Sequence, residues 1–80
     1  MNVGEAVRIR ILDLCREHNF TVNKLCTASG VTQSTVNNII SGRNNSTTIS
    51  TIKKLCDGLG ITIEEFFQAE VFRHLEQEIQ

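Results

Sequence analysis

The chain has 80 residues and a formal net charge of −1, which bounds it to a single domain with a small hydrophobic core. Its apolar runs fall well short of the roughly 20 residues that a membrane span needs. Its first residues also lack the basic start and apolar block of an export signal. We therefore expect a cytoplasmic domain with no membrane partner.

The three cysteines, Cys15, Cys26 and Cys56, are odd in number and far apart, and each lies within an apolar helical pattern. We expect them to be buried small hydrophobic residues in a reducing compartment. A metal site would need closely spaced cysteines or nearby histidine ligands, and neither His18 nor His74 has that spacing. The sequence predicts no metal and no cofactor.

The charge is unevenly distributed along the chain. Residues 1–60 carry seven basic and four acidic side chains, a net charge of +3, whereas residues 61–80 carry one basic and five acidic, a net charge of −4. DNA phosphates would repel the acidic segment, so we expect it to point away from any nucleic acid. A net charge of +3 is small for a DNA-binding protein, so we expect a single copy to bind non-specific DNA weakly. Two copies bound together would have to supply the phosphate contacts.

The absence of proline and of long apolar alternation predicts helices throughout. The first is expected over residues 3–18, where Asn2 followed by Glu5 resembles a capping box. Asn19 suits the left-handed residue that ends a helix. Apolar spacing gives this helix a core-facing stripe, made of Val7, Ile11, Leu14, Cys15 and His18.

The next two helices are expected to be short and joined by a tight turn. One covers residues 22–28 with Thr21 as its N-cap, and Gly30 supplies the positive φ of the turn. The other covers residues 33–41, with Thr32 as its N-cap.

The exposed face of the helix over residues 33–41 is polar without being charged. Its side chains offer both donors and acceptors, which reading base edges in the DNA major groove requires. An ordinary solvated face would be richer in Glu and Lys, which are better helix formers. The residues on this face are Gln33, Ser34, Thr35, Asn37, Asn38 and Ser41.

The second half of the chain begins with a polar loop over residues 43–47. A helix is expected over residues 49–58 with Thr48 as its N-cap, and Thr62 with Glu65 forms a second capping box that opens a fifth helix. No breaker follows, so the fifth helix either runs on to residue 79 or restarts near residue 68. The apolar stripe of the fourth helix consists of Ile49, Ile52, Leu55, Cys56 and Leu59.

Residues 68–80 form a helical extension beyond the domain of residues 1–67, with a narrow apolar stripe on an acidic helix. The stripe either folds back on its own domain or packs against a second copy. We expect the second, a homodimer, because it doubles a marginal charge and places two reading helices about 34 Å apart. The stripe that forms the expected interface consists of Val71, Phe72, Leu75 and Ile79.

The segment over residues 8–67 resembles the Cro/phage-repressor helix-turn-helix family, also called XRE-like regulators. The resemblance implies an all-α fold, a compact five-helix lambda-repressor-like DNA-binding domain, here with an extra C-terminal helix or helix extension. It also implies that the third helix lies in the major groove of double-stranded DNA. The matching residues are Leu25, Cys26, Gly30, Val31, Gln33 to Val36, Ile39, Gly42, Thr51, Leu55, Leu59 to Ile61 and Glu65 to Phe67.

By this resemblance, Gln33 and Ser34 touch base edges, and Gln33 can bond bidentately to adenine. Arg43 and Asn45 are natural phosphate partners, and Asn44 falls where some phage repressors add a contact. The full set expected to contact DNA is Lys24, Thr32, Gln33, Ser34, Thr35, Asn37, Asn38, Ser41, Arg43 and Asn44.

Two departures from the family pattern concern the helix contacts. The first position of the second helix is often a Gln that contacts a phosphate and braces the first residue of the third helix. Val22 stands there, so we expect that brace to be missing. Cys15 and Ile40 replace an Arg–Glu pair, and an apolar replacement of a buried ion pair leaves no stranded charge.

The expected function is that of a sequence-specific DNA-binding transcriptional regulator, acting as a repressor. An enzyme is not expected, because the sequence shows no Cys–His pair, carboxylate dyad or phosphate loop. No small-molecule ligand is indicated. The alternative is a protein-binding adaptor or an antitoxin module on the same fold.

Overall fold

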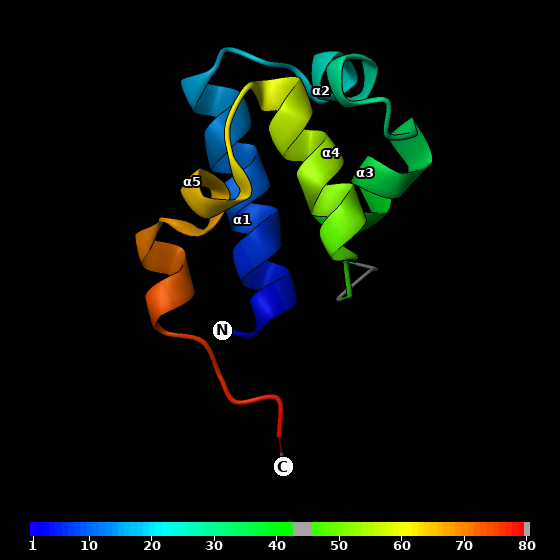
Figure 1. Ribbon diagram of the computed structural model, residues 1–80. Helices are drawn as coiled ribbons and strands as arrows, with labels where there is room; N and C mark the ends of the chain where they lie inside the picture. The colour runs from blue at the N-terminus through cyan, green and yellow to red at the C-terminus, as the bar shows by residue number, and fades with distance from the viewer. Residues whose placement is uncertain (43–45, 80) are drawn as a thin grey trace.

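The computed structural model describes residues 1–42 and 46–79, which are helical with no strand among them. The five α-helices confirm the all-α prediction. Helix α2 packs against α4, α3 packs against both α1 and α2, and α5 packs against α4 (Figure 1). The elements are α1 Val3–Glu17, α2 Val22–Ser29, α3 Gln33–Ile40, α4 Ile49–Leu59, α5 Ile63–Phe67 and a 3₁₀ turn, η1 Glu70–Arg73.

A polar N-cap residue fixes the start of every α-helix, as predicted. In each case the cap side chain accepts a hydrogen bond from the backbone nitrogen three residues later. Thr62 and Glu65 form a complete capping box, but Asn2 and Glu5 form only half of one. The Asn2 side chain accepts from the Glu5 backbone at 2.8 Å, and no return bond reaches the Asn2 backbone. The caps are Asn2, Thr21, Thr32, Thr48 and Thr62.

Two left-handed residues set the chain reversals on either side of α2. Asn19 has a φ of 56° after α1, and Gly30 has a φ of 72° after α2. Glycine adopts this region without the steric penalty of a Cβ atom, and asparagine tolerates it better than most residues. The tight turn at Gly30 brings the start of α3 beside α2.

One hydrophobic core joins the five α-helices, and its largest fully buried side chains include Phe66, Ile11 and Leu25. Two predicted core positions are wrong. His18 is exposed because it is the C-cap of α1 and lies beyond the packed face. Ile49 is 62% exposed because it is the first residue of α4, where the apolar stripe extends past the core.

Arg10 in α1 holds the end of α5. Its guanidinium donates to the carbonyl oxygen of Phe66 at 2.7 Å and to that of Glu65 at 2.8 Å. Carbonyls at a helix C-terminus have no partner within the helix, so a side-chain donor satisfies them. Arg10 therefore fixes α5 against α1.

The C-terminal segment differs from its prediction. Helix α5 ends at Phe67, η1 follows, and residues 74–79 are not helical. The turn brings the Phe72 ring to 4.9 Å from the Phe67 ring and 6.1 Å from the Phe66 ring, centroid to centroid. Burying Phe72 against its own core competes with a longer helix, so the fold-back interpretation holds for this residue. The Glu76 backbone nitrogen then donates to the Met1 carbonyl at 3.0 Å.

Candidate nucleic-acid interface

Helix α3 buries an apolar face and exposes a polar one. Val36 and Ile39 are buried, and Ile40 packs against the core from a half-buried position. Because helical side chains three and four positions apart share a face, this packing turns the intervening polar residues outward. The exposed side chains are those of Gln33, Ser34, Asn37, Asn38 and Ser41.

The side chains on this face differ in how free they are to bind a ligand. Within the described part of the chain, no hydrogen bond engages the Ser34 hydroxyl or the side-chain amides of Asn37 and Asn38. The Ser41 hydroxyl donates to the Asn38 carbonyl at 3.2 Å. Three of the predicted contact residues therefore present unused donors and acceptors on one exposed helix face.

Thr35 is less available than the sequence suggested. Its side chain is half-buried, and its hydroxyl lies 2.8 Å from the hydroxyl of Thr32, the N-cap of α3. The Thr32 hydroxyl also accepts from the Thr35 backbone nitrogen at 3.3 Å. These two threonines primarily hold the first turn of α3 in place.

Gln33, the first residue of α3, is braced by a residue of α2. Its Nε2 donates to the Oδ1 of Asn23 at 2.8 Å. The expectation that this brace is missing is therefore wrong, since the residue after Val22 supplies it. The sequence did not show it because the bond depends on the angle at which α2 and α3 meet.

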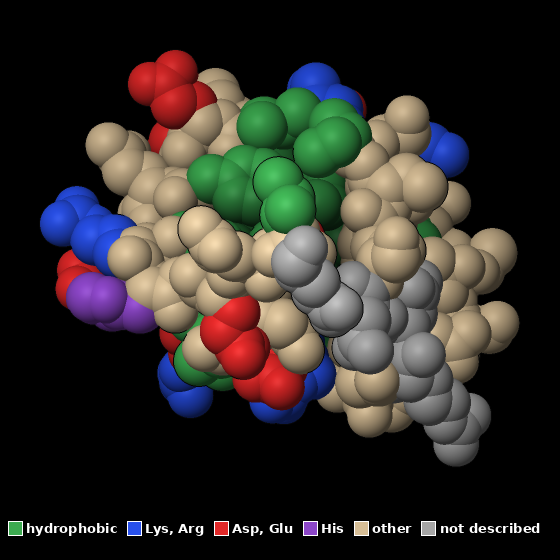
Figure 2. All heavy atoms as spheres, turned by 90° about the horizontal axis from the view of Figure 1, so that it is seen from below, with side chains coloured by type: hydrophobic (Ala, Val, Ile, Leu, Met, Phe, Trp, Pro, Cys, Tyr) green, Lys and Arg blue, Asp and Glu red, His purple; other side chains and the backbone are tan. Residues whose placement is uncertain are grey.

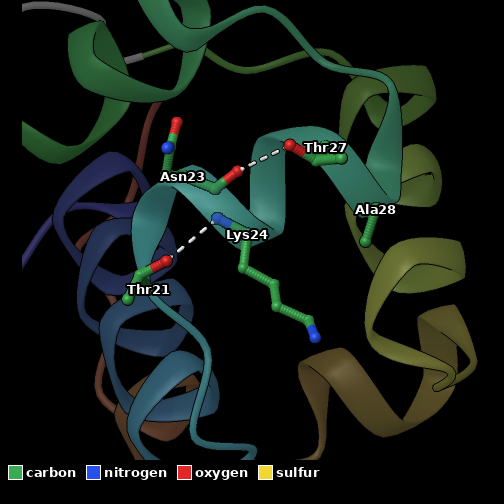
Figure 3. Close-up of a pocket in the computed structure, with 5 residues that line it drawn as sticks. All are labelled: Thr21, Asn23, Lys24, Thr27 and Ala28. Atoms are coloured by element: carbon green, nitrogen blue, oxygen red, sulfur yellow. Dashed lines mark hydrogen bonds between the residues drawn. The ribbon is translucent and has the colours of Figure 1, made fainter.

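The outer face of α2 borders an open hollow of about 400 Å³ (Figure 3). In the close-up, the Asn23 amide points toward α3, while the Lys24 chain extends the opposite way. The Lys24 ammonium lies 5.4 Å from the centre of the Phe20 ring, a cation–π distance. The hollow is lined by Thr21, Asn23, Lys24, Thr27 and Ala28.

Most cations in the described residues already have a partner. Arg16 pairs with Asp13, Lys53 with Asp57, and Arg73 with Glu70. Among the described residues, the basic side chains without an ion pair or carbonyl partner are Arg8, Lys24 and Lys54. Of these three, Lys24 is the residue that the sequence predicted to contact DNA, and it is exposed on α2.

Arg43 and Asn44, both predicted to contact DNA, lie outside the described residues, as does Asn45. The predicted interface residues of the C-terminal segment differ in their exposure to solvent. Phe72 packs inward, whereas Leu75 is 38% and Ile79 is 87% exposed.

A second hollow, of about 120 Å³ and mostly apolar, opens where α1 and α4 begin. Viewed from that end, hydrophobic side chains gather into a visible patch (Figure 2). Ile49 is the most exposed side chain of this hollow. Exposed apolar patches of this kind commonly mark protein–protein contacts. The lining residues are Val3, Gly4, Val7, Thr47, Ile49, Ile52 and Phe67.

The three cysteines are buried and unpaired, as the sequence predicted. Desolvation by burial raises the pKa of the Cys15 and Cys56 thiols, which disfavours their thiolate forms. Over residues 1–42 and 46–79, no group of three or more metal-ligating side chains comes together. No helix in these ranges is long and apolar enough to cross a membrane.

A short capped helix, a tight turn and a second helix with an exposed polar face define a helix-turn-helix DNA-binding domain. Residues 10–71 match the family of Cro/C1-type HTH DNA-binding domains, and the chain belongs to that family. The crystal structure of the prophage Lp1 protein 11 has the same fold, with a TM-score of 0.81 and 37% sequence identity. That match covers 94% of this chain and all of the prophage chain, 100%. Among curated proteins, none matches the sequence.

Proposed function

We propose that the protein is a sequence-specific transcriptional regulator that reads the DNA major groove with α3. The observation that carries this proposal is the exposed polar face of α3, on which the side chains of Ser34, Asn37 and Asn38 make no hydrogen bond within the described residues. An α-helix fits the major groove, where each base pair presents a distinct pattern of donors and acceptors. In this proposal Gln33 reads a base edge, and Ser34, Asn37 and Asn38 contact bases or backbone.

The positions of the basic side chains support separate roles for base contacts, made by α3, and phosphate contacts, made by Lys24 and Arg43. Lys24 lies on α2, next to α3 along the chain, and has no acidic partner among the described residues. Arg43 follows α3 in sequence, and both side chains are assigned here to phosphates. Phosphate contacts fix the register of a protein on DNA and supply most of its salt-dependent affinity.

We further propose that the protein binds DNA as a homodimer and acts as a cytoplasmic repressor by occupying its site. One copy carries little net positive charge, and a two-fold dimer doubles the number of phosphate contacts. The start of α4 and the segment after η1 both lie at the end of the molecule where α1 begins (Figure 1). Exposed apolar side chains in these two segments are Ile49 in the first and Leu75 and Ile79 in the second. That end is assigned to the second copy.

Selection from a pool of DNA duplexes with a randomised central segment tests the function. The selected DNA should contain a two-fold repeated motif, and nuclease digestion should reveal a protected footprint over it. The same domain bearing Gln33→Ala and Asn38→Ala should select no motif while keeping its helical content. Selection of no motif by the wild-type protein would favour the rival function of a protein-binding adaptor. The apolar patch is also compatible with that function.

A further inference from the structure

An open apolar hollow and an exposed apolar segment lie at the same end of the molecule. The hollow of about 120 Å³ opens where α1 and α4 begin, and the segment over residues 74–79 follows η1 at that end (Figure 1). Ile79 is 87% exposed, the highest value for a large hydrophobic side chain among the described residues. The segment does not line the hollow of its own chain. Both apolar surfaces therefore face water, and burying them together would be favourable.

The hollow has room for one branched aliphatic side chain. An engineered apolar cavity of about 150 Å³ in another protein binds one benzene molecule, so a hollow of about 120 Å³ suits the smaller side chain of an isoleucine. Its lining is mostly aliphatic and aromatic and comes from α1, α4 and α5. A polar side chain would lose its hydrogen bonds to water on entering such a lining. An aliphatic side chain such as that of Ile79 loses none.

The charges beside the hollow and beside Ile79 are complementary. Arg8 lies on α1 one turn after Gly4, a residue of the hollow, and residues four apart share a helix face. Arg8 is half-buried, and it has no acidic or carbonyl partner among the described residues. Glu78 directly precedes Ile79, is exposed, and also has no ion pair within the described ranges. A guanidinium and a carboxylate of this kind form strong charge-assisted hydrogen bonds when they meet.

The segment has the length to reach a second molecule. The bond from the Glu76 backbone nitrogen to the Met1 carbonyl, 3.0 Å long, holds the middle of the segment beside the start of α1. Residues 77–79 are exposed and not helical, and three extended residues span up to about 10 Å. A two-fold dimer that pairs these ends sets the segment of each copy beside the hollow of the other. The same contact then forms twice, as in any two-fold interface.

We propose that residues 77–79 of each copy dock into the apolar hollow of a second copy, with Ile79 inside it and Glu78 against Arg8. The inference rests on the proposed homodimer and names the contact that holds it. The chain itself supplies the chemistry that the hollow accepts, an aliphatic side chain next to a carboxylate. The two surfaces are therefore assigned to each other in a pair of identical chains.

Exchanging the two charges separates docking between copies from docking within one chain. The variants are Arg8→Glu, Glu78→Arg and the double variant, and sedimentation at one fixed low salt concentration gives the dimer dissociation constant of each. In either single variant, like charges meet at both contacts of the homodimer. In an equimolar mixture of the two single variants, opposite charges meet at both contacts of the mixed dimer. The new carboxylate of one chain then faces the new guanidinium of the other.

We expect each single variant to raise the dissociation constant about fivefold to thirtyfold, the effect of two exposed charge contacts. The double variant and the equimolar mixture should both return to within about twofold of the wild type. Lys54→Glu is the matched control, because Lys54 is also unpaired among the described residues but lies on the outer side of α4. It should leave the dissociation constant nearly unchanged. Recovery in the double variant without recovery in the mixture would show docking within one chain and overturn the proposal.

The apolar half of the contact is tested separately. Ile79→Ala should raise the dissociation constant at least about tenfold, because each dimer loses two buried aliphatic side chains. Gln77→Ala, in the same exposed segment, should leave it unchanged, and circular dichroism should show equal helical content in all variants. A wild-type dissociation constant in Ile79→Ala would overturn this contact and leave the proposed dimer to another surface. A monomeric wild type would overturn both, whereas selection of a DNA motif tests the reading role of α3 independently.

Discussion

A Cβ atom on Gly58 would lie 2.8 Å from the backbone nitrogen of Ser29 and 2.9 Å from its Cα. Helix α4 therefore meets the last residue of α2 at a position where only glycine fits. Ser29 directly precedes the turn at Gly30, which leads into α3. The contact thus fixes the end of α2 from which the candidate reading helix departs.

We expect Gly58→Ala to lower the free energy of unfolding by about 1–3 kcal/mol, the usual effect of overpacking a close contact. The neighbouring atoms belong to backbone and cannot move aside cheaply, so the strain should outweigh the helix propensity gained, about 1 kcal/mol. Urea unfolding followed by circular dichroism measures this. Lys54→Ala, on the exposed side of the same helix, is the control and should change stability by less than about 0.5 kcal/mol. A more stable Gly58→Ala variant would show that α2 and α4 are not tightly packed there.

The helices were predictable because their signals are local. Thr21, Thr32 and Thr48 each precede an apolar helical pattern, and each caps a helix in the structure. Gly30 ends α2 with a positive φ, as the sequence predicted from the conformational freedom of glycine. Capping and turn chemistry depend on residues within four positions of one another, so a single sequence reveals them.

The features that the sequence missed depend on packing between elements. Asn23 and Gln33 are ten positions apart, and their bond follows from the turn that sets α3 beside α2. The periodic stripe after residue 68 predicted a helix, but Phe72 gains more by packing against Phe66 and Phe67. Periodicity reports which residues are apolar and does not report which surface they meet.

Burial should make the cysteines slow to react. Because the pKa of Cys15 and Cys56 is raised, their thiols stay protonated at neutral pH and resist iodoacetamide, whereas denaturant should expose all three cysteines. Mass spectrometry of the labelled protein measures this. The folded protein holds the Cys15 and Cys56 protons more tightly than the unfolded chain does, because the pKa of both thiols is raised in the fold. This contribution to stability is present below the ordinary thiol pKa of about 8.5 and is lost as the pH rises above it. Rapid labelling of native Cys15 or Cys56 at neutral pH would contradict their burial.

Lys24 should contribute affinity without specificity. Lys24→Ala is expected to weaken binding to selected and random duplexes alike, and to reduce the slope of log affinity against log salt by about one. Titrations at several salt concentrations give that slope. Arg73→Ala, in the acidic C-terminal segment, serves as the control and should leave it unchanged. A slope unaffected by Lys24→Ala would remove this residue from the phosphate contacts.

The dimer should depend on the exposed apolar side chains more than on Phe72. Analytical ultracentrifugation should show an intact dimer at tens of micromolar, and Leu75→Asp with Ile79→Asp should shift it toward monomer at unchanged helical content. Phe72→Ala should instead lower the free energy of unfolding, because the Phe72 ring packs against the core. The expected loss is about 1–3 kcal/mol, less than for a fully buried ring, because Phe72 is only partly buried. A monomeric wild-type protein at these concentrations would contradict the proposed dimer.

The central claim is that α3 reads sequence, and a single ratio tests it most directly. Fluorescence anisotropy at fixed salt gives the affinity of the protein for its selected duplex and for a scrambled duplex of the same composition. We predict that the wild type prefers the selected duplex by at least about a thousandfold. Gln33→Ala should reduce that preference by about 1–3 kcal/mol and leave binding to the scrambled duplex nearly unchanged. Equal affinity of the wild type for both duplexes, or equal losses on both in Gln33→Ala, would contradict the account.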